Sequence, residues 1–259
     1  MSYKFILTAV SSVGDAHQKS DEFYFADGLT SVIKNACNSV RTRNICKGRK
    51  HIFSVISCRE HFSMLCDYLY HALMKRNNDK VRIKVQYALR AITDEIYAMT
   101  GKEDDSRMSM LYIDGSNIYA SGFGDTHIYH ISKNSTKATK VTFQLPTLSD
   151  AIISDGEDSE ADERSVNTWS RCLGKLNAKD EYLIVGSYLQ SLLGDDAVCD
   201  VLSASHINSP SVLADKAHMV DSSCTVSALH IMVKKTFPAL WISLGASLFA
   251  IALALFFLI

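Results

Sequence analysis

The chain has 259 residues, of which 47% are hydrophobic and 21% charged, a balance that is typical of globular proteins and excludes wholesale disorder. Its 27 Lys and Arg against 28 Asp and Glu give a formal charge of −1, which argues against a domain held by nucleic-acid phosphates. The seven cysteines are odd in number and form no C-x-x-C pair, so reduced thiols are expected rather than a disulfide framework or a zinc ribbon.

The first half of the chain is predicted to contain strands followed by two helices. Residues 4–13 and 23–26 are apolar strand-like runs, and the second ends at the turn dipeptide Asp27-Gly28. The segment RTRNICKGRK, residues 41–50, contains five Lys or Arg. We interpret it as a solvated loop, with a basic patch for a membrane surface or a partner as the alternative. Apolar residues at helical spacing then predict helices over 60–74 and 81–99.

From Ser109 the apolar period changes to two, which predicts three short strands with hairpin turns at Asp114-Gly115 and Gly124-Asp125. Six acids among residues 154–163 indicate a solvated loop whose carboxylates could bind a cation. The remaining patterns predict a strand, two helices and a closing strand, over 182–185, 195–202, 211–217 and 225–233. Strands, two long helices, strands, helices and a strand are the order of an α+β layered domain.

The last 23 residues, 237–259, contain no charged side chain. As a helix they would be about 34 Å long, enough to cross a hydrocarbon core of about 30 Å. Lys234 and Lys235 stand just before this run, and positive flanks favour the cytoplasmic side of a membrane. The sequence therefore predicts a cytosolic domain over 1–233, a basic juxtamembrane flank over 234–236 and a single-pass C-terminal transmembrane anchor over 237–259.

Five segments resemble, in the same order, motifs of the metal-dependent type-2C protein phosphatases, the PPM family. FYFADG resembles V-x-D-G, WSRCLGKL resembles the R-x-L-G segment, and SGFGDTHIYHI is similar to a strand–G-D-S–strand hairpin. The fourth and fifth are DEYLIVGSYLQSLLGDDAVCDVL, similar to D-x-L-L-L-x-S-D-G with its following helix, and LADKAHMVDSSCTVSALHIMV, similar to the closing helix, D-N-x-T and last strand. The resemblance covers nearly all of residues 4–233 and implies a four-layer α-β-β-α sandwich of two antiparallel sheets flanked by helix pairs.

The resemblance also implies a site for two Mn²⁺ or Mg²⁺ ions, which prefer oxygen ligands and together lower the pKa of a bridging water. It puts Asp27 and the carbonyl of Gly28 at the bridging-metal position. The upstream N-E-D position falls in KSDEF, so that either Asp21 or Glu22 would supply a second carboxylate.

Two other ligand positions lack the expected carboxylate. The S-D-G position reads Ser187-Tyr188-Leu189, where Tyr188 is a neutral phenol near pH 7. The D-N-x-T position, counted back from Thr225, gives Ser222, and Asp221 stands one residue too early.

The phosphate-contacting arginine of many family members is replaced here by His17 or Lys19, which are the candidates for phosphate binding.

Three hypotheses about the function follow. The first is a degenerate, membrane-tethered pseudophosphatase that binds or scaffolds a phosphoprotein or a regulatory protein and needs no metal. The second is an active Mn²⁺- or Mg²⁺-dependent phospho-Ser/Thr phosphatase with a rearranged metal site, and the third is a structural subunit of a membrane complex. None of them involves a nucleic acid.

Overall fold

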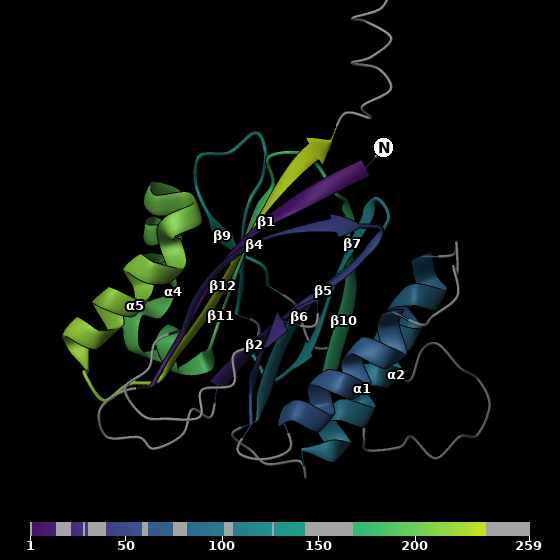
Figure 1. The fold of residues 1–259 in the computed structure, drawn as a ribbon, viewed down its shortest axis with the longest axis horizontal. Helices are drawn as coiled ribbons and strands as arrows, with labels where there is room; N and C mark the ends of the chain where they lie inside the picture. Colours follow the sequence, from purple (N-terminus) through teal and green to yellow (C-terminus); the bar gives the residue numbers. More distant parts are fainter. Residues whose placement is uncertain are drawn as a thin grey trace, which may run out of the picture.

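The computed structural model describes residues 2–13, 22–27, 29–30, 40–58, 62–74, 82–100, 106–125, 127–142 and 168–236. Two six-stranded antiparallel sheets lie face to face (Figure 1). In one sheet the strand order is β4(Val40–Gly48), β1(Ser2–Ser12), β12(Val226–Thr236), β11(Glu181–Val185), β8(Ile128–Ile131), β9(Thr139–Lys140). In the other it is β10(Thr168–Lys175), β7(Asn117–Phe123), β6(Arg107–Asp114), β5(Lys50–Ser57), β2(Glu22–Ala26), β3(Leu29–Thr30).

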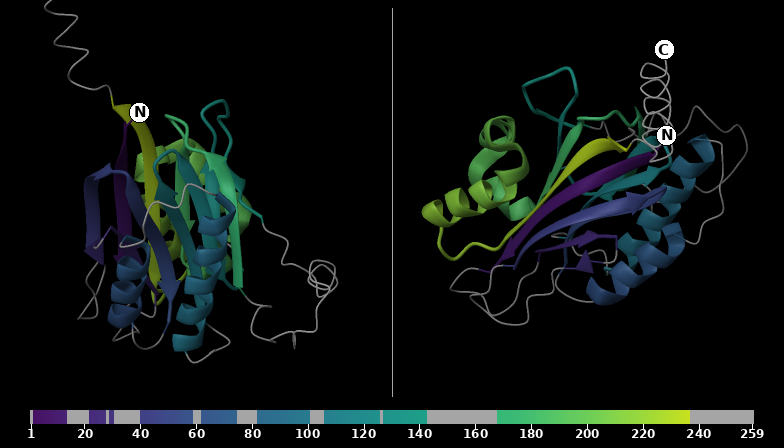
Figure 2. Two further views of the ribbon diagram at one scale, coloured as in Figure 1. Left: turned by 90° about the vertical axis from the view of Figure 1, so that its right-hand side faces the viewer. Right: turned by 45° about the horizontal axis from the view of Figure 1, so that its top comes forward.

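Four helices of the described residues cover the outer faces of the two sheets (Figure 2). The helices α1(Phe62–Met74) and α2(Arg82–Met99) pack on the sheet that contains β5, and α4(Ser187–Ser205) and α5(Ser209–Val220) pack on the sheet that contains β1. Three apolar layers result, one between the sheets and one beneath each helix pair. This arrangement confirms the predicted α-β-β-α sandwich. The layers stack in this way because each amphipathic layer buries its apolar face on the next.

The carboxyl-terminal prediction falls outside the described residues. β12 continues to Thr236, so Lys234 and Lys235 lie within the last strand, and 237–259 are not described. Among the described helices none combines the length and the apolar character needed to cross a membrane.

Two sequence interpretations are wrong. The basic segment 41–50 is no loop, because most of it forms the edge strand β4, and its last residue begins β5. An edge strand tolerates charged side chains since one of its sides is unpaired. The turn at Gly124-Asp125 does not close a hairpin, because β7 and β8 belong to different sheets and the chain crosses between them here. The Asp114-Gly115 hairpin and both long helices are confirmed.

His127, just after this crossover, is buried and gives the fold an acid-sensitive position. Burial, together with the nearby ammonium of Lys140, lowers the pKa of its imidazole to about 4. The folded pKa lies below the unfolded value of 6.5, so the stabilisation by neutral His127 is complete above pH 6.5 and is lost as the pH falls toward 4. We expect the urea midpoint to fall more steeply over this range in the unmodified chain than in His127→Gln. Equal slopes would contradict this assignment.

Candidate functional site

The candidate site lies at one end of the sandwich, where four strand ends meet. Because β2 and β5 are antiparallel, the first residue of β2, Glu22, lies opposite the last residue of β5, Ser57. β11 ends and β12 begins at the same end, and α4 starts there with Ser187. Residues far apart in sequence are thereby brought together around Glu22.

The Glu22 carboxylate is the centre of this site and is only 4% exposed. Its Oε1 accepts hydrogen bonds from the backbone N–H of Tyr188 at 2.8 Å, the hydroxyl of Ser187 at 3.1 Å and the hydroxyl of Ser57 at 3.2 Å. Bonds from neutral donors to an ionised acceptor are strong, so these three donors compensate much of the cost of burying the charge. The carboxylate is held by the protein itself.

Gly186 provides the space that this carboxylate occupies. A Cβ atom at Gly186 would lie 1.8 Å from Oε2 of Glu22, far closer than two such atoms can approach. The backbone of Gly186, at φ −70° and ψ 156°, is open to any residue. Space, and not backbone conformation, therefore requires glycine at this position.

Tyr188 and Asp221 form the exposed rim of the site. The Tyr188 hydroxyl donates to Oδ2 of Asp221 at 3.4 Å, and Oδ1 of Asp221 accepts the N–H and the hydroxyl of Ser223, at 2.9 Å and 2.6 Å. Partial burial and the negative charge of Asp221 raise the pKa of the Tyr188 phenol. The phenol is therefore neutral at pH 7, where it is a poor ligand for a hard dication.

A second polar group, absent from the sequence analysis, adjoins the first. The His218 ring contacts the Ser12 hydroxyl through Nε2 at 2.8 Å and the Cys224 sulfur through Nδ1 at 3.7 Å. Burial and the Asp221 carboxylate raise the pKa of the Cys224 thiol to about 11. Since the thiolate is the reactive form of cysteine, this arrangement does not activate Cys224 as a nucleophile.

Asp27 lies at the other end of β2, roughly 16 Å along the strand from Glu22 at 3.3 Å per residue. One carboxylate oxygen accepts the N–H of Ile52 at 2.8 Å, and the other lies 2.5 Å from Nδ1 of His51, whose ring is 2% exposed. Asp27 thus fastens the end of β2 to β5.

Of the candidate site residues, the structure brings Glu22 and Asp221 to one region and leaves Asp27 apart from them. Asp21, Gly28, His17 and Lys19 lie outside the described residues.

Because Asp27 makes these bonds at a φ of 48°, its replacement is expected to lower stability. Asp27→Ala removes an acceptor from Ile52 and His51 and places alanine in the left-handed region, so we expect a loss of about 2 kcal/mol in urea unfolding. Asp27→Asn keeps one acceptor and tolerates this φ, so its loss should be about half as large. Equal stability of the alanine variant and the unmodified chain would contradict a fastening role.

The residues of the described part do not fit a pair of hard dications. No group of three or more His, Cys, Asp or Glu there could hold a metal ion. Around Glu22 the other oxygen groups are neutral hydroxyls that donate to it, and Asp221 is engaged by Ser223 and Tyr188. A two-metal site needs several carboxylates pointing at one point, and this end of the sandwich offers one buried carboxylate surrounded by donors.

Comparisons with known proteins identify the architecture. No protein-family model and no curated protein sequence matches the chain. Solved structures do match, among them the catalytic domain of the serine/threonine protein phosphatase PstP in complex with two manganese ions. That match has a TM-score of 0.55 and 14% identity and covers 90% of this chain and 100% of that one. The chain has the fold of the PPM-type protein phosphatases.

Two further PPM-type structures support this assignment. The phosphatase domain of the cell fate determinant SpoIIE from Bacillus subtilis matches with a TM-score of 0.60 and 13% identity, over 92% of this chain and 95% of that one. The serine/threonine phosphatase Stp1 from Staphylococcus aureus matches with a TM-score of 0.56 and 11% identity, over 88% and 95%. The PPM fold accounts for how Glu22, Ser57, Tyr188 and Asp221 come to share one end of the sandwich.

Proposed function

We propose that this chain is a pseudophosphatase, a PPM-type domain that binds a phosphoprotein or a regulatory protein without hydrolysing a phosphate ester. The observation that supports it is the state of Glu22, whose Oε1 is held by Tyr188 N–H and the hydroxyls of Ser187 and Ser57. A carboxylate oxygen used as a metal ligand faces the ion, whereas Oε1 of Glu22 accepts bonds from three protein donors. The neutral phenol of Tyr188 adds no anionic ligand beside it.

Turnover tests this proposal directly. The full chain, purified in detergent, is incubated with phosphoserine and phosphothreonine peptides in Mn²⁺ and separately in Mg²⁺, and free phosphate is measured. We expect a release rate no higher in the unmodified chain than in Glu22→Gln, which keeps the size of the side chain and removes its charge. Metal-dependent release that Glu22→Gln abolishes would instead support an active phosphatase with a rearranged site.

The proposal includes a membrane anchor formed by residues 237–259, with the PPM domain on the cytoplasmic side. Its support is the uncharged run of 23 residues after Lys234 and Lys235. Confinement to a membrane would raise the effective concentration of partners on the same surface. We expect the full chain to stay in the membrane fraction after alkaline extraction and a chain ending at residue 236 to be released. Release of both chains would rule out the anchor.

A further inference from the structure

Three lysines lie in one cross-strand row at the edge of the β1 sheet. Lys4 on β1 is opposite Lys47 on β4 on one side and opposite Lys234 on β12 on the other. Directly opposed like charges repel, so such a row is costly unless the charges face solvent or an anion. The row lies where β1 begins and β12 ends, at the opposite end of the sheet from Ser12 and Val226.

All three lysines project from the outer face of the sheet. The alternate residues Phe5, Val233 and Cys46, which form the neighbouring row, pack into the apolar layer between the sheets. Because successive side chains of a strand point to opposite faces, the lysines point away from this layer. Lys47 and Lys234 are exposed and Lys4 is half-buried.

The lysine row continues into an exposed apolar and basic edge. On β4 the same face carries Ile45, which is 54% exposed, and the exposed Arg43. Ile45 pairs with Ile6 and Ile6 with Met232, so an apolar row lies beside the lysine row. Glu181, which pairs with Met232 on this face, is engaged by the rings of His230 and His206. An exposed isoleucine among cations is typical of surfaces that meet anionic lipid headgroups.

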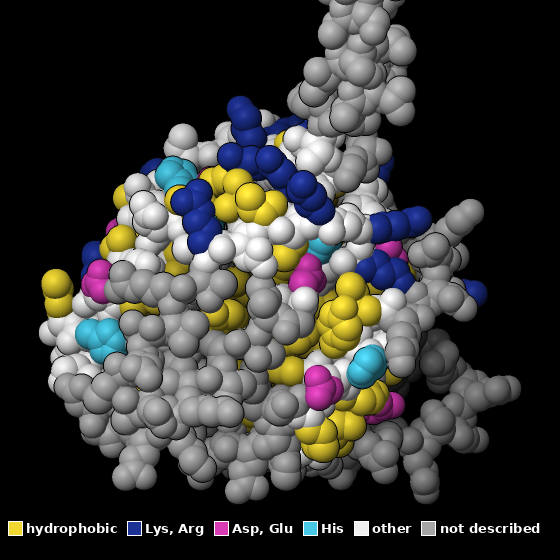
Figure 3. Space-filling model, viewed as in Figure 1, with side chains coloured by type: hydrophobic (Ala, Val, Ile, Leu, Met, Phe, Trp, Pro, Cys, Tyr) yellow, Lys and Arg dark blue, Asp and Glu magenta, His cyan; other side chains and the backbone are white. Residues whose placement is uncertain are grey.

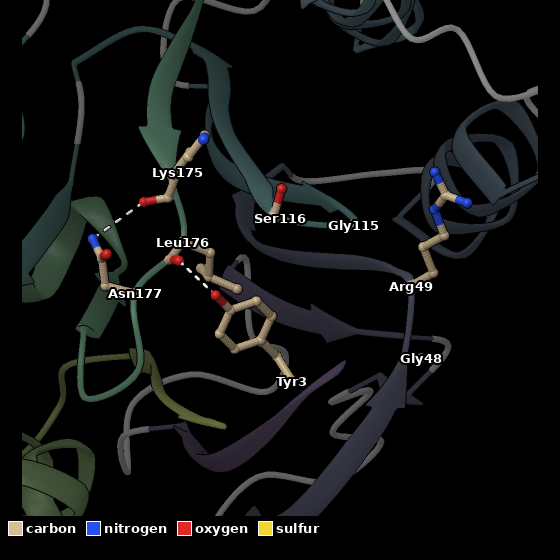
Figure 4. Close-up of a pocket in the computed structure, with 8 residues that line it drawn as sticks. All are labelled: Tyr3, Gly48, Arg49, Gly115, Ser116, Lys175, Leu176 and Asn177. Carbon is tan, nitrogen blue, oxygen red and sulfur yellow. Dashed lines mark hydrogen bonds between the residues drawn. The ribbon is translucent and has the colours of Figure 1, made fainter. Parts of the chain in front are cut away.

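The same end of the molecule holds a cavity of about 770 Å³ between the two sheets. Arg49 and Lys175 flank it on opposite sides, and the backbones of Gly48 and Gly115 form part of its wall (Figure 4). The Arg49 side chain is 66% exposed and lies 3.7 Å from Asp114, and Lys175 is exposed. Tyr3, beside Lys4, closes the cavity from the β1 side and donates its hydroxyl to the carbonyl of Leu176.

These cations gather around the point at which β12 ends, as Figure 3 shows for Lys and Arg side chains at this end of the molecule. Lys179 joins them, because its backbone N–H donates to the carbonyl of Val233 at 2.8 Å. The next residue after β12 is the start of the 23-residue uncharged segment. Wherever that segment enters a membrane, this end of the domain is the part nearest to the headgroups.

We propose that this end of the domain, the basic end formed by Lys4, Lys47, Lys234, Arg49 and Lys175, docks on anionic phospholipid headgroups. The inference rests on the proposed membrane anchor and adds an orientation to it. The basic end faces the lipid, and the Glu22 end, roughly 23 Å away along the eight residues of β5, faces the cytoplasm. A partner that binds near Glu22 would then approach from the side away from the membrane.

Lysine footprinting tests the docking without changing the amino-acid sequence. The full chain is reconstituted in nanodiscs of phosphatidylcholine alone or with about one third phosphatidylserine, acetylated with a water-soluble reagent and analysed by peptide mass spectrometry. In the phosphatidylserine discs we expect Lys4, Lys47 and Lys234 to react about fivefold more slowly, a factor that corresponds to about 1 kcal/mol of headgroup attraction per lysine. Lys216, exposed on α5, is the internal control and should react equally in both discs.

The outcomes separate the docking from the anchor. Equal reaction rates of the three lysines in both discs, with the chain incorporated, would overturn the docking and leave the anchor in place. A chain that enters neither disc would overturn the anchor and the docking with it. Replacing Lys4 and Lys47 together by Glu should abolish the protection of Lys234, whereas the matched charge reversal Lys216→Glu should leave it unchanged. Protection that persists in the double variant would contradict docking through the lysine row.

Discussion

Gly186→Ala is expected to lower the free energy of unfolding by about 3 kcal/mol, measured by urea denaturation. The new methyl group would lie 1.8 Å from Oε2 of Glu22, and neither the buried carboxylate nor the Tyr188 N–H bonded to it can move away freely. Elsewhere this substitution would stabilise a chain slightly, since alanine restricts the unfolded state and the φ of Gly186 suits it. A loss of unfolding free energy on Gly186→Ala would therefore indicate that the Glu22 carboxylate lies against Gly186, whereas a gain would indicate that it does not.

The control is the same substitution in a Glu22→Ala background. Without the carboxylate there is room for a methyl group, so Gly186→Ala should cost less than about 0.5 kcal/mol or become stabilising. The coupling between the two positions would then exceed about 2 kcal/mol. A cost that is the same in both backgrounds would show that Glu22 does not lie against Gly186.

A metal site should be created by adding two carboxylates to the described residues around Glu22. In Ser57→Asp with Tyr188→Asp, two new anions lie beside Glu22, so we expect a lower melting temperature than that of the unmodified chain when a chelator is present. Adding Mn²⁺ should reverse the loss. At a concentration one hundred times the dissociation constant, the ion would add about 2.7 kcal/mol of stability.

The matched control replaces Ser57 and Tyr188 by Asn, which changes both side chains to a similar size without adding charge. This variant and the unmodified chain should show no change of melting temperature with Mn²⁺. If the unmodified chain gained as much stability as the double aspartate variant, its own residues would already bind the ion. If the aspartate variant did not respond, the three side chains would not converge on one point.

The layered fold could be predicted because its amphipathic periods are strong. Helices over 60–74 and 81–99 and the strands after Ser109 follow from apolar spacing alone, and the structure places them within a few residues. Two of the strands that were not predicted have a clear physical reason. β4 carries the exposed Arg43 and Lys47, which are typical of a loop, and β5 is buried on both faces, so its apolar run has no period of two.

The candidate site was only partly predictable. The family resemblance left Asp21 and Glu22 as alternatives and put Tyr188 at a ligand position, and Glu22 and Tyr188 do lie together. It grouped Asp27 with them through the V-x-D-G motif, but a D-G dipeptide is also an ordinary turn, and the extended β2 separates Asp27 from Glu22. The contact of His218 with Ser12, 206 residues apart, depends on how α5 packs against β1 and leaves no local signal in the sequence.

Titration of Mn²⁺ into the full chain by calorimetry tests directly whether this PPM fold has lost its metal pair. We expect no binding with a dissociation constant below about 1 mM, and no difference between the unmodified chain and Glu22→Gln. Two ions bound per chain with micromolar affinity, lost in Glu22→Gln, would contradict it.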